Sequence, residues 1–215
     1  MAYPARVTTQ SDEYGRHNLF EDSGYYEAQN ADSSLADPED RLAYGDAPAT
    51  QWHGGVDFGL LVLRIVLGGA LGAHGLQKVF GLFDGPGIGE FARILGDQGY
   101  TSQTTVLAWV GGITEVAGGA LLILGLFTPV AAGALLAISA NAVYLTHTEG
   151  FFLRGEEGFE YHAVLAGIAF ALLFSGPGRI SFDLNTPWRR RPVPFGIAFL
   201  ILAGGAVAVL ATAFR

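Results

Sequence analysis

The segment 57–80 constrains the fold more than any other part of the chain, because it is apolar and long enough to cross a bilayer yet carries three polar side chains. These are Arg64, His74 and Lys78. On a helix with Arg64 at 0°, Lys78 falls at about −40° and His74 at about −80°, together with two glycines, while Leu, Val and Ile occupy the opposite side. The pattern predicts a transmembrane helix whose polar side faces other helices or a water-filled cavity.

The overall composition indicates a polytopic membrane protein. Half of the 215 residues are hydrophobic and 15% are charged, which is too apolar for a soluble domain with runs of this length. The chain contains no cysteine, so it can form no disulfide and offers no thiolate to a metal. It shows no basic patch of the kind that binds nucleic acid. The first 50 residues lack the apolar core of a cleavable signal peptide, so the first span is expected to act as the insertion signal.

Further apolar segments follow, separated by turns rich in Gly and Pro. The segment 160–175 has an apolar core of only about 14 residues, which is short for a bilayer core of about 30 Å. Apolar residues at helical spacing in 88–95 predict an amphipathic surface helix. We predict an all-α membrane protein, with a four-helix transmembrane bundle over 54–184 and an Arg-rich loop and fifth C-terminal transmembrane helix over 185–215. The predicted spans are 57–80, 105–127, 130–147, 160–175 and 195–214.

Residues 1–53 form a separate acidic segment. They include ten acidic and three basic residues and so carry nearly all of the net charge of −8. Aliphatic residues are too sparse there to offset the loss of chain entropy on folding, which predicts a disordered tail. The alternative is a segment that orders on a partner, because aromatic residues are unusually frequent in it.

The distribution of positive charge predicts the orientation. Arg179 and the run 189–191 follow the fourth span, whereas the loops on the other side carry Arg93 and Arg154, with Lys78 at a helix end. The excess of positive charge marks the cytoplasmic side, so we expect the N-terminal tail in the cytoplasm. Five spans would then place the end of the chain outside.

With this orientation, ionisable side chains from several spans lie at one depth, in the outer half of the membrane. Glu115 lies beneath them near the centre, and Arg64 lies in the inner half. An ionisable group at the bilayer centre costs at least about 2.5–3.5 kcal/mol, so this convergence predicts a shared polar site. The candidate ligand-binding or proton-relay residues are Arg64, His74, Lys78, Glu115, Asn141, Tyr144, His147, Glu160 and His162.

Structural alternatives exist for these residues. Arg64 could instead pair with Glu115 or cap a helix, and Asn141 could hold two helices together. The residues near helix ends could simply occupy the membrane interface: Lys78, His147, Glu160 and His162. No metal site is predicted, because the suitable ligands come from different spans and no two lie four residues apart in one span.

An ordered set of short motifs resembles the DoxX family of small bacterial membrane proteins. The set comprises Arg64, His74-Gly75, Lys78, Glu115, Gly119, Leu124-Gly125-Leu126, Thr128-Pro129, His147, Glu160-Tyr161, Gly176-Pro177-Gly178, Ser181 and Asp183. The resemblance covers about 57–184 and implies a four-helix bundle in the bacterial cytoplasmic membrane, linked to redox and oxidative-stress physiology. The positions of this chain that correspond to the family's motifs, without assigned roles, are Arg64, His74, Lys78, Glu115 and Glu160. The acidic tail and the fifth span lie outside the resemblance.

Three functions are consistent with these features. The leading hypothesis is a membrane-embedded accessory or anchoring subunit of a respiratory or oxidative-stress redox assembly, which binds protein partners through its tail and bundle surface. The second is a quinone-reactive subunit, in which the polar cluster binds a quinone carbonyl and His74 or Glu115 relays protons. The Gly-lined faces of the first two spans would supply its opening, and a partner would supply electrons because the chain encodes no redox centre. The third, a small-molecule or ion transporter, is disfavoured by the lack of an inverted repeat.

Overall fold

The computed structural model describes residues 54–152 and 158–215, and all regular secondary structure within these ranges is helical. The predicted acidic tail and Arg154 lie outside the described residues. The helices are α3 (Gly54–Phe80), α4 (Gly87–Asp97), α5 (Thr104–Leu124), α6 (Thr128–Thr146), the 3-10 helix η1 (His147–Glu149), α7 (Glu160–Ser175), α8 (Pro187–Arg190) and α9 (Pro192–Ala213).

Four helices of the described part are long and apolar enough to cross a membrane, namely α3, α5, α6 with η1, and α9. The prediction of an all-α membrane protein is therefore confirmed. Helix α7, the predicted fourth span, has only 16 residues, as its short apolar core indicated. The predicted surface helix is α4. The side of the membrane on which each end lies stays a prediction.

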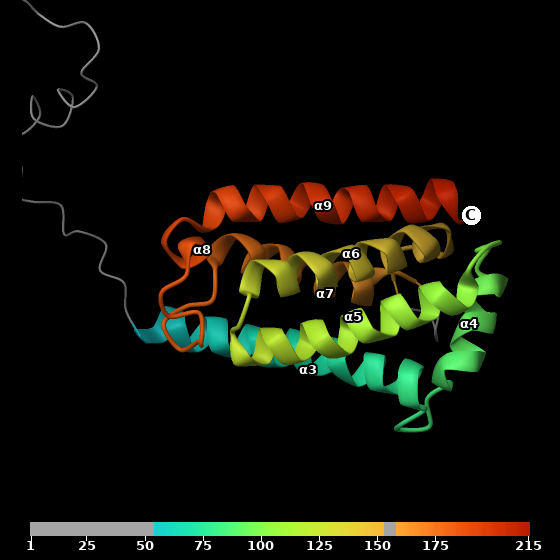
Figure 1. Cartoon of the computed structure of the whole chain (residues 1–215), viewed down its shortest axis with the longest axis horizontal. Coiled ribbons are helices and arrows are strands. Elements are labelled where there is room, and N and C mark those ends of the chain that lie inside the picture. Colours follow the sequence, from blue (N-terminus) through green and yellow to red (C-terminus); the bar gives the residue numbers. More distant parts are fainter. Residues whose placement is uncertain (1–53, 153–157) are drawn as a thin grey trace, which may run out of the picture. The chain divides into compact units, whose positions relative to one another are not determined.

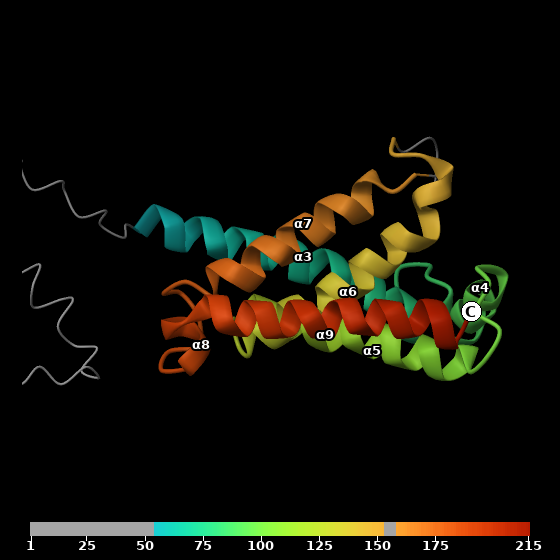
Figure 2. The ribbon, with the colours of Figure 1, turned by 90° about the horizontal axis from the view of Figure 1, so that it is seen from above.

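The helices form three layers (Figure 1). Helices α3 and α5 lie side by side, α6 and α7 pack together in the next layer, and α9 packs on α6 and α7. Helix α7 runs obliquely to α9 (Figure 2). Helix α4 contacts α3 and α5 at one end of the bundle and α8 lies at the other, so we refer below to the α4 end and the α8 end. The fifth predicted span is thus packed directly against the four-helix bundle.

Glycines bring α3 and α5 into close contact. A Cβ on Gly119 would lie 2.5 Å from the carbonyl oxygen of Gly68, and a Cβ on Gly75 would lie 2.7 Å from the backbone nitrogen of Val116. Small residues permit this approach because the two backbones meet without intervening side chains. The close approach expected from the glycine pattern is therefore present. It also means that the Gly-lined faces cover each other over most of their length, around Gly68, Gly75 and Gly119.

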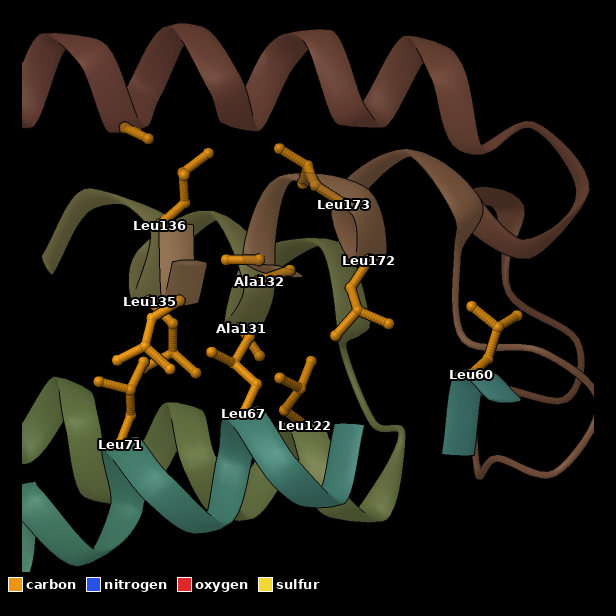
Figure 3. Close-up of a cluster of buried hydrophobic side chains, with 13 residues drawn as sticks. Leu60, Leu67, Leu71, Leu122, Ala131, Ala132, Leu135, Leu136, Leu172 and Leu173 are labelled. Carbon is orange, nitrogen blue, oxygen red and sulfur yellow. The ribbon is translucent and has the colours of Figure 1, made fainter. Parts of the chain in front are cut away.

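Leucines fill the space between the layers (Figure 3). Leu67 of α3, Leu122 of α5 and Leu135 of α6 are all fully buried, and they lie between the first and second layers. Leu136 and Leu173 point toward α9 (Figure 3). Helix α9 has only 11% of its apolar window buried, so most of its surface is available to lipid. The leucine core holds the layers together and fixes the helices that line the site.

Candidate functional site

A cavity of about 410 Å³ lies at the α4 end of the bundle. It is enclosed by the last turns of α3, by α4 and α5, and by parts of α6, α7 and α9, so all three layers contribute to it. Most of its wall is apolar and comes from residues such as Phe91, Ile138 and Leu210. Its polar side chains are His74, Gln77, Lys78, Gln98, Tyr100, Glu115, Asn141, Thr146 and His162.

An ion pair between α3 and α5 lies in the wall of this cavity. The Lys78 Nζ is 2.5 Å from Oε1 of Glu115, whose side chain is 2% exposed, whereas that of Lys78 is 27% exposed. The Lys78 Nζ also lies 4.9 Å from the centre of the Phe91 ring, on α4, which favours the ammonium ion. Burial penalises a lone carboxylate, and this pairing offsets the penalty.

Only half of the Glu115 carboxylate is paired. Its Oε2 is buried and has no hydrogen-bond partner among the described residues, and the same is true of Nδ1 of His162 on α7. Buried polar atoms are normally hydrogen-bonded, so two unpartnered ones on residues lining the same cavity require an explanation. Both atoms belong to side chains that line the cavity, so a molecule held there is a candidate partner for each of them.

His74 connects α3 with α7 beside this pair. Its Nδ1 lies 3.1 Å from Oε1 of Gln77, and its Nε2 lies 3.2 Å from the Tyr161 hydroxyl. Tyr161 is 39% exposed, so the contact joins a cavity-lining histidine to the surface of the bundle. Tyr161 was not among the predicted site residues. The available signal was its place beside Glu160 at the start of a span, but an aromatic there is equally typical of a membrane interface.

Asn141 contributes a tethered polar group to the opposite wall. The Tyr100 hydroxyl donates to its Oδ1 at 3.0 Å, and its Nδ2 donates to the same hydroxyl at 2.8 Å. Tyr100 is 3% exposed, so the pair ties the loop between α4 and α5 to the C-terminal half of α6. Asn141 thus joins a helix to a loop, whereas the structural alternative had it holding two helices together.

Four predicted residues lie outside the cavity lining: Tyr144, His147, Glu160 and Arg64. Tyr144 stacks on His147 with ring centres 5.8 Å apart, and Nδ1 of His147 lies 2.6 Å from the Tyr144 carbonyl oxygen. The Arg215 guanidinium lies over the Tyr144 ring, 5.4 Å from its centre. Glu160 begins α7 and is half-buried. The structure therefore brings together His74, Lys78, Glu115, Asn141 and His162, and leaves Tyr144, His147 and Glu160 apart from them.

Arg64 belongs to a different network at the α8 end. It is fully buried and donates a hydrogen bond to the carbonyl oxygen of Ile180. A Cβ on Gly125, where α5 ends, would overlap its Nη1, so glycine is required there. Nearby, the Asp183 carboxylate accepts hydrogen bonds from the backbone nitrogens of Phe127 and Thr128, at 3.0 and 2.9 Å. The proposed Arg64–Glu115 pair is not formed, because Glu115 pairs with Lys78.

Comparison with known proteins identifies the family. Residues 59–148 match DoxX. An uncharacterized membrane protein of Mycobacterium tuberculosis, Rv3486, is 38% identical over 136 residues, which cover 58% of this chain and 78% of the relative. The chain belongs to the DoxX family. No solved structure matches it.

Only part of the cavity wall lies within the residues that match DoxX. His74, Lys78, Glu115 and Asn141 lie within residues 59–148, whereas His162 and the α9 residue Leu210 lie beyond them. The ion pair therefore belongs to the part of the chain that matches DoxX, and one wall of the cavity comes from the part that follows it. Among the described residues, no group of three or more His, Asp or Glu side chains could hold a metal ion.

Proposed function

We propose that this DoxX-family protein binds a lipophilic molecule of the quinone class within the membrane, as a subunit of a redox assembly. The observation that carries the proposal is the cavity at the α4 end, whose wall is mostly apolar and includes Glu115 and His162, each of which has a buried, unpartnered polar atom. Small-molecule sites typically combine such a wall with a few converging polar groups. A quinone has matching chemistry, with an apolar ring and oxygen atoms at its edge.

The size and position of the cavity fit the head group of such a molecule. Ligand pockets usually measure roughly 300–1,000 Å³, and about 410 Å³ accommodates a substituted ring but not a long isoprenoid tail as well. Val110 lines the cavity and is 58% exposed, which places part of the opening on the side of α5. A tail could therefore extend from the cavity into the acyl chains.

The proposal includes a redox assembly because a bound quinone needs a protein with which to exchange electrons. The chain has no cysteine and encodes no recognisable redox centre, so a quinone bound here would exchange electrons with a partner protein. The quinone and anchoring hypotheses are compatible in this respect, because each requires a partner. The cavity favours the quinone hypothesis, since anchoring alone does not require an apolar cavity with a few polar side chains inside the bundle.

A binding experiment with a cavity-filling variant tests the proposal. Decylubiquinone, which has a short tail, is titrated into the purified full chain in detergent, and the unfolding temperature is measured. At a ligand concentration of 100 times Kd, binding stabilises the protein by about 2.7 kcal/mol, which a thermal shift resolves. Ile138→Trp fills the cavity without changing its polar groups, so we expect it to abolish the shift.

Ile65→Trp is the matched control. Ile65 is 48% exposed on α3 and does not line the cavity, so this variant should bind decylubiquinone as the wild type does. The proposal is wrong if the wild type shows no saturable shift. It is also wrong if both tryptophan variants bind equally well, because the ligand would then lie outside the cavity.

A further inference from the structure

We propose that the cavity selects the reduced, hydroxyl-bearing form of its ligand, a quinol, over the oxidised dicarbonyl form. This inference rests on the proposed function and concerns the same site. It is carried by the hydrogen-bonding chemistry of one atom, the Oε2 of Glu115.

An ionised carboxylate only accepts hydrogen bonds. Oε1 of Glu115 accepts one from Lys78 at 2.5 Å, and Oε2 remains buried without a donor. A quinone carbonyl is also only an acceptor, so it cannot satisfy Oε2 and would place two electron-rich oxygens side by side. A quinol hydroxyl can donate to Oε2, and this charge-assisted bond is among the stronger hydrogen bonds in proteins.

This contact requires an ionised Glu115: burial penalises its charge, and pairing with Lys78 offsets that penalty. The Lys78 ammonium lies in direct contact with it, and the Phe91 ring favours the positive charge of Lys78 in turn. Transfer of the proton from Lys78 to Glu115 would leave a neutral pair that keeps a hydrogen bond but loses the attraction between the charges and the contact of the ammonium with the Phe91 ring. The charged pair is therefore the state that presents Oε2 as an acceptor.

The remaining groups complete the contact with a hydroxyl. The Lys78 ammonium has three donors, of which Glu115 uses one, so another can reach a hydroxyl oxygen that donates to Oε2. His162 does not discriminate between the two ligand forms, because a neutral imidazole can present Nδ1 as donor or acceptor. The preference for the reduced form therefore depends on Glu115.

The expected preference follows from the value of a hydrogen bond to a charged group. Such a bond contributes about 1.5–3 kcal/mol, and we therefore expect the quinol to bind about tenfold to a hundredfold more tightly than the quinone. The test is a pair of titrations of the full chain with decylubiquinol and decylubiquinone, performed anaerobically in the same detergent. Thermal shift or equilibrium dialysis gives the two dissociation constants.

Glu115→Gln tests the cause of the preference. Its amide can donate to a carbonyl or accept from a hydroxyl, so the preference should shrink to within about threefold. Glu90→Gln, a substitution of an exposed acid on α4, should leave the preference unchanged. Glu115→Asp keeps a carboxylate and should retain a preference for the quinol.

The outcomes separate this inference from the proposed function. A wild type that binds quinone as tightly as quinol overturns the inference and leaves the proposed function standing. Failure to bind either form overturns the proposed function itself. If Glu115→Gln does not fold, the ratio of the two wild-type dissociation constants still shows whether the cavity prefers the quinol. An unaltered preference in a folded Glu115→Gln protein would show that another group discriminates, and the assignment to Glu115 would be wrong.

Discussion

Replacing Lys78 by Met should destabilise the protein by about 3 kcal/mol. Methionine keeps most of the length and apolar contact of the lysine but leaves Glu115, which is 1% exposed, without a counter-ion. Removing one partner of a buried ion pair typically costs about 3–5 kcal/mol, because the other charge remains buried. We expect the lower end of this range, since 27% of the Lys78 side chain is exposed and the pair is only partly shielded from solvent.

Neutralising the other partner, Glu115, should destabilise the protein less. Glu115→Gln leaves an ammonium that can extend toward water, so we expect a loss of about 1 kcal/mol. The double variant removes both charges and should cost no more than Lys78→Met alone. The two single losses should therefore exceed that of the double variant, and the difference gives a coupling energy of about 1–3 kcal/mol.

These free energies can be measured by reversible unfolding in mixed micelles, followed by far-ultraviolet circular dichroism. Arg93→Met is the control, because it removes the same kind of charge from an exposed pair on α4 and should leave stability unchanged. If Lys78→Met is no more destabilising than Arg93→Met, then Glu115 does not depend on Lys78 as its counter-ion. Strict additivity of the two single changes would refute the pairing itself.

Three further perturbations test other parts of the structure. Gly119→Ala should destabilise the α3–α5 contact by about 1–3 kcal/mol, whereas Gly69→Ala, which has open space beside it on α3, should be neutral or slightly stabilising in the same unfolding assay. Asp183→Ala should cost at least about 2 kcal/mol of unfolding free energy, because it leaves buried backbone donors at the start of α6 unpaired. The hydrogen bond from Arg93 lowers the pKa of Glu90, so the pair's contribution to α4 is present above the ordinary value of 4.5 and is lost as the pH falls through the lowered pKa. A carbon-13 titration of the Glu90 carboxyl should show a midpoint below 4.5 that rises in Arg93→Met.

The helices could be predicted from the sequence because apolar length and turn residues determine them locally. The segment 88–95 likewise revealed an amphipathic helix, which the structure shows as α4. The glycines predicted that two helices approach closely, and α3 and α5 do so. Each of these inferences uses only residues within one or two elements, where the physical constraint is strong.

The partner of Glu115 could not be predicted, because it depends on the register between two helices. Arg64 and Lys78 lie on the same side of α3, and either could reach a carboxylate on a neighbouring helix. The structure fixes the register by placing Gly68 against Gly119 and Gly75 against Glu115. Arg64 is then displaced from Glu115 by about three helical turns, roughly 16 Å along the axis. Nothing in the spacing within a single helix contains this information.

The position of the cavity also could not be predicted from sequence patterns. The glycine-lined faces suggested an opening between the first two spans, but those faces cover each other over most of their length, and of their glycines Gly111 lines the cavity. The actual space lies where the short α7 and the amphipathic α4 meet the ends of longer helices, and its wall includes Leu210 of α9. Such a space depends on the mismatch in helix length and on the crossing of α7, both of which are properties of the assembled bundle.

Arg64 shows why the cavity, and not burial alone, distinguishes the Glu115 site. Its Nε and Nη1 are also buried without hydrogen-bond partners among the described residues. They are packed so closely against Gly125 that even a methyl group would overlap Nη1, and Arg64 does not line the cavity. Glu115 combines an unpartnered atom with a position in the wall of a cavity that can hold a ligand. Both ends of the bundle contain a buried charge, and the one at the α4 end belongs to a residue that lines this cavity.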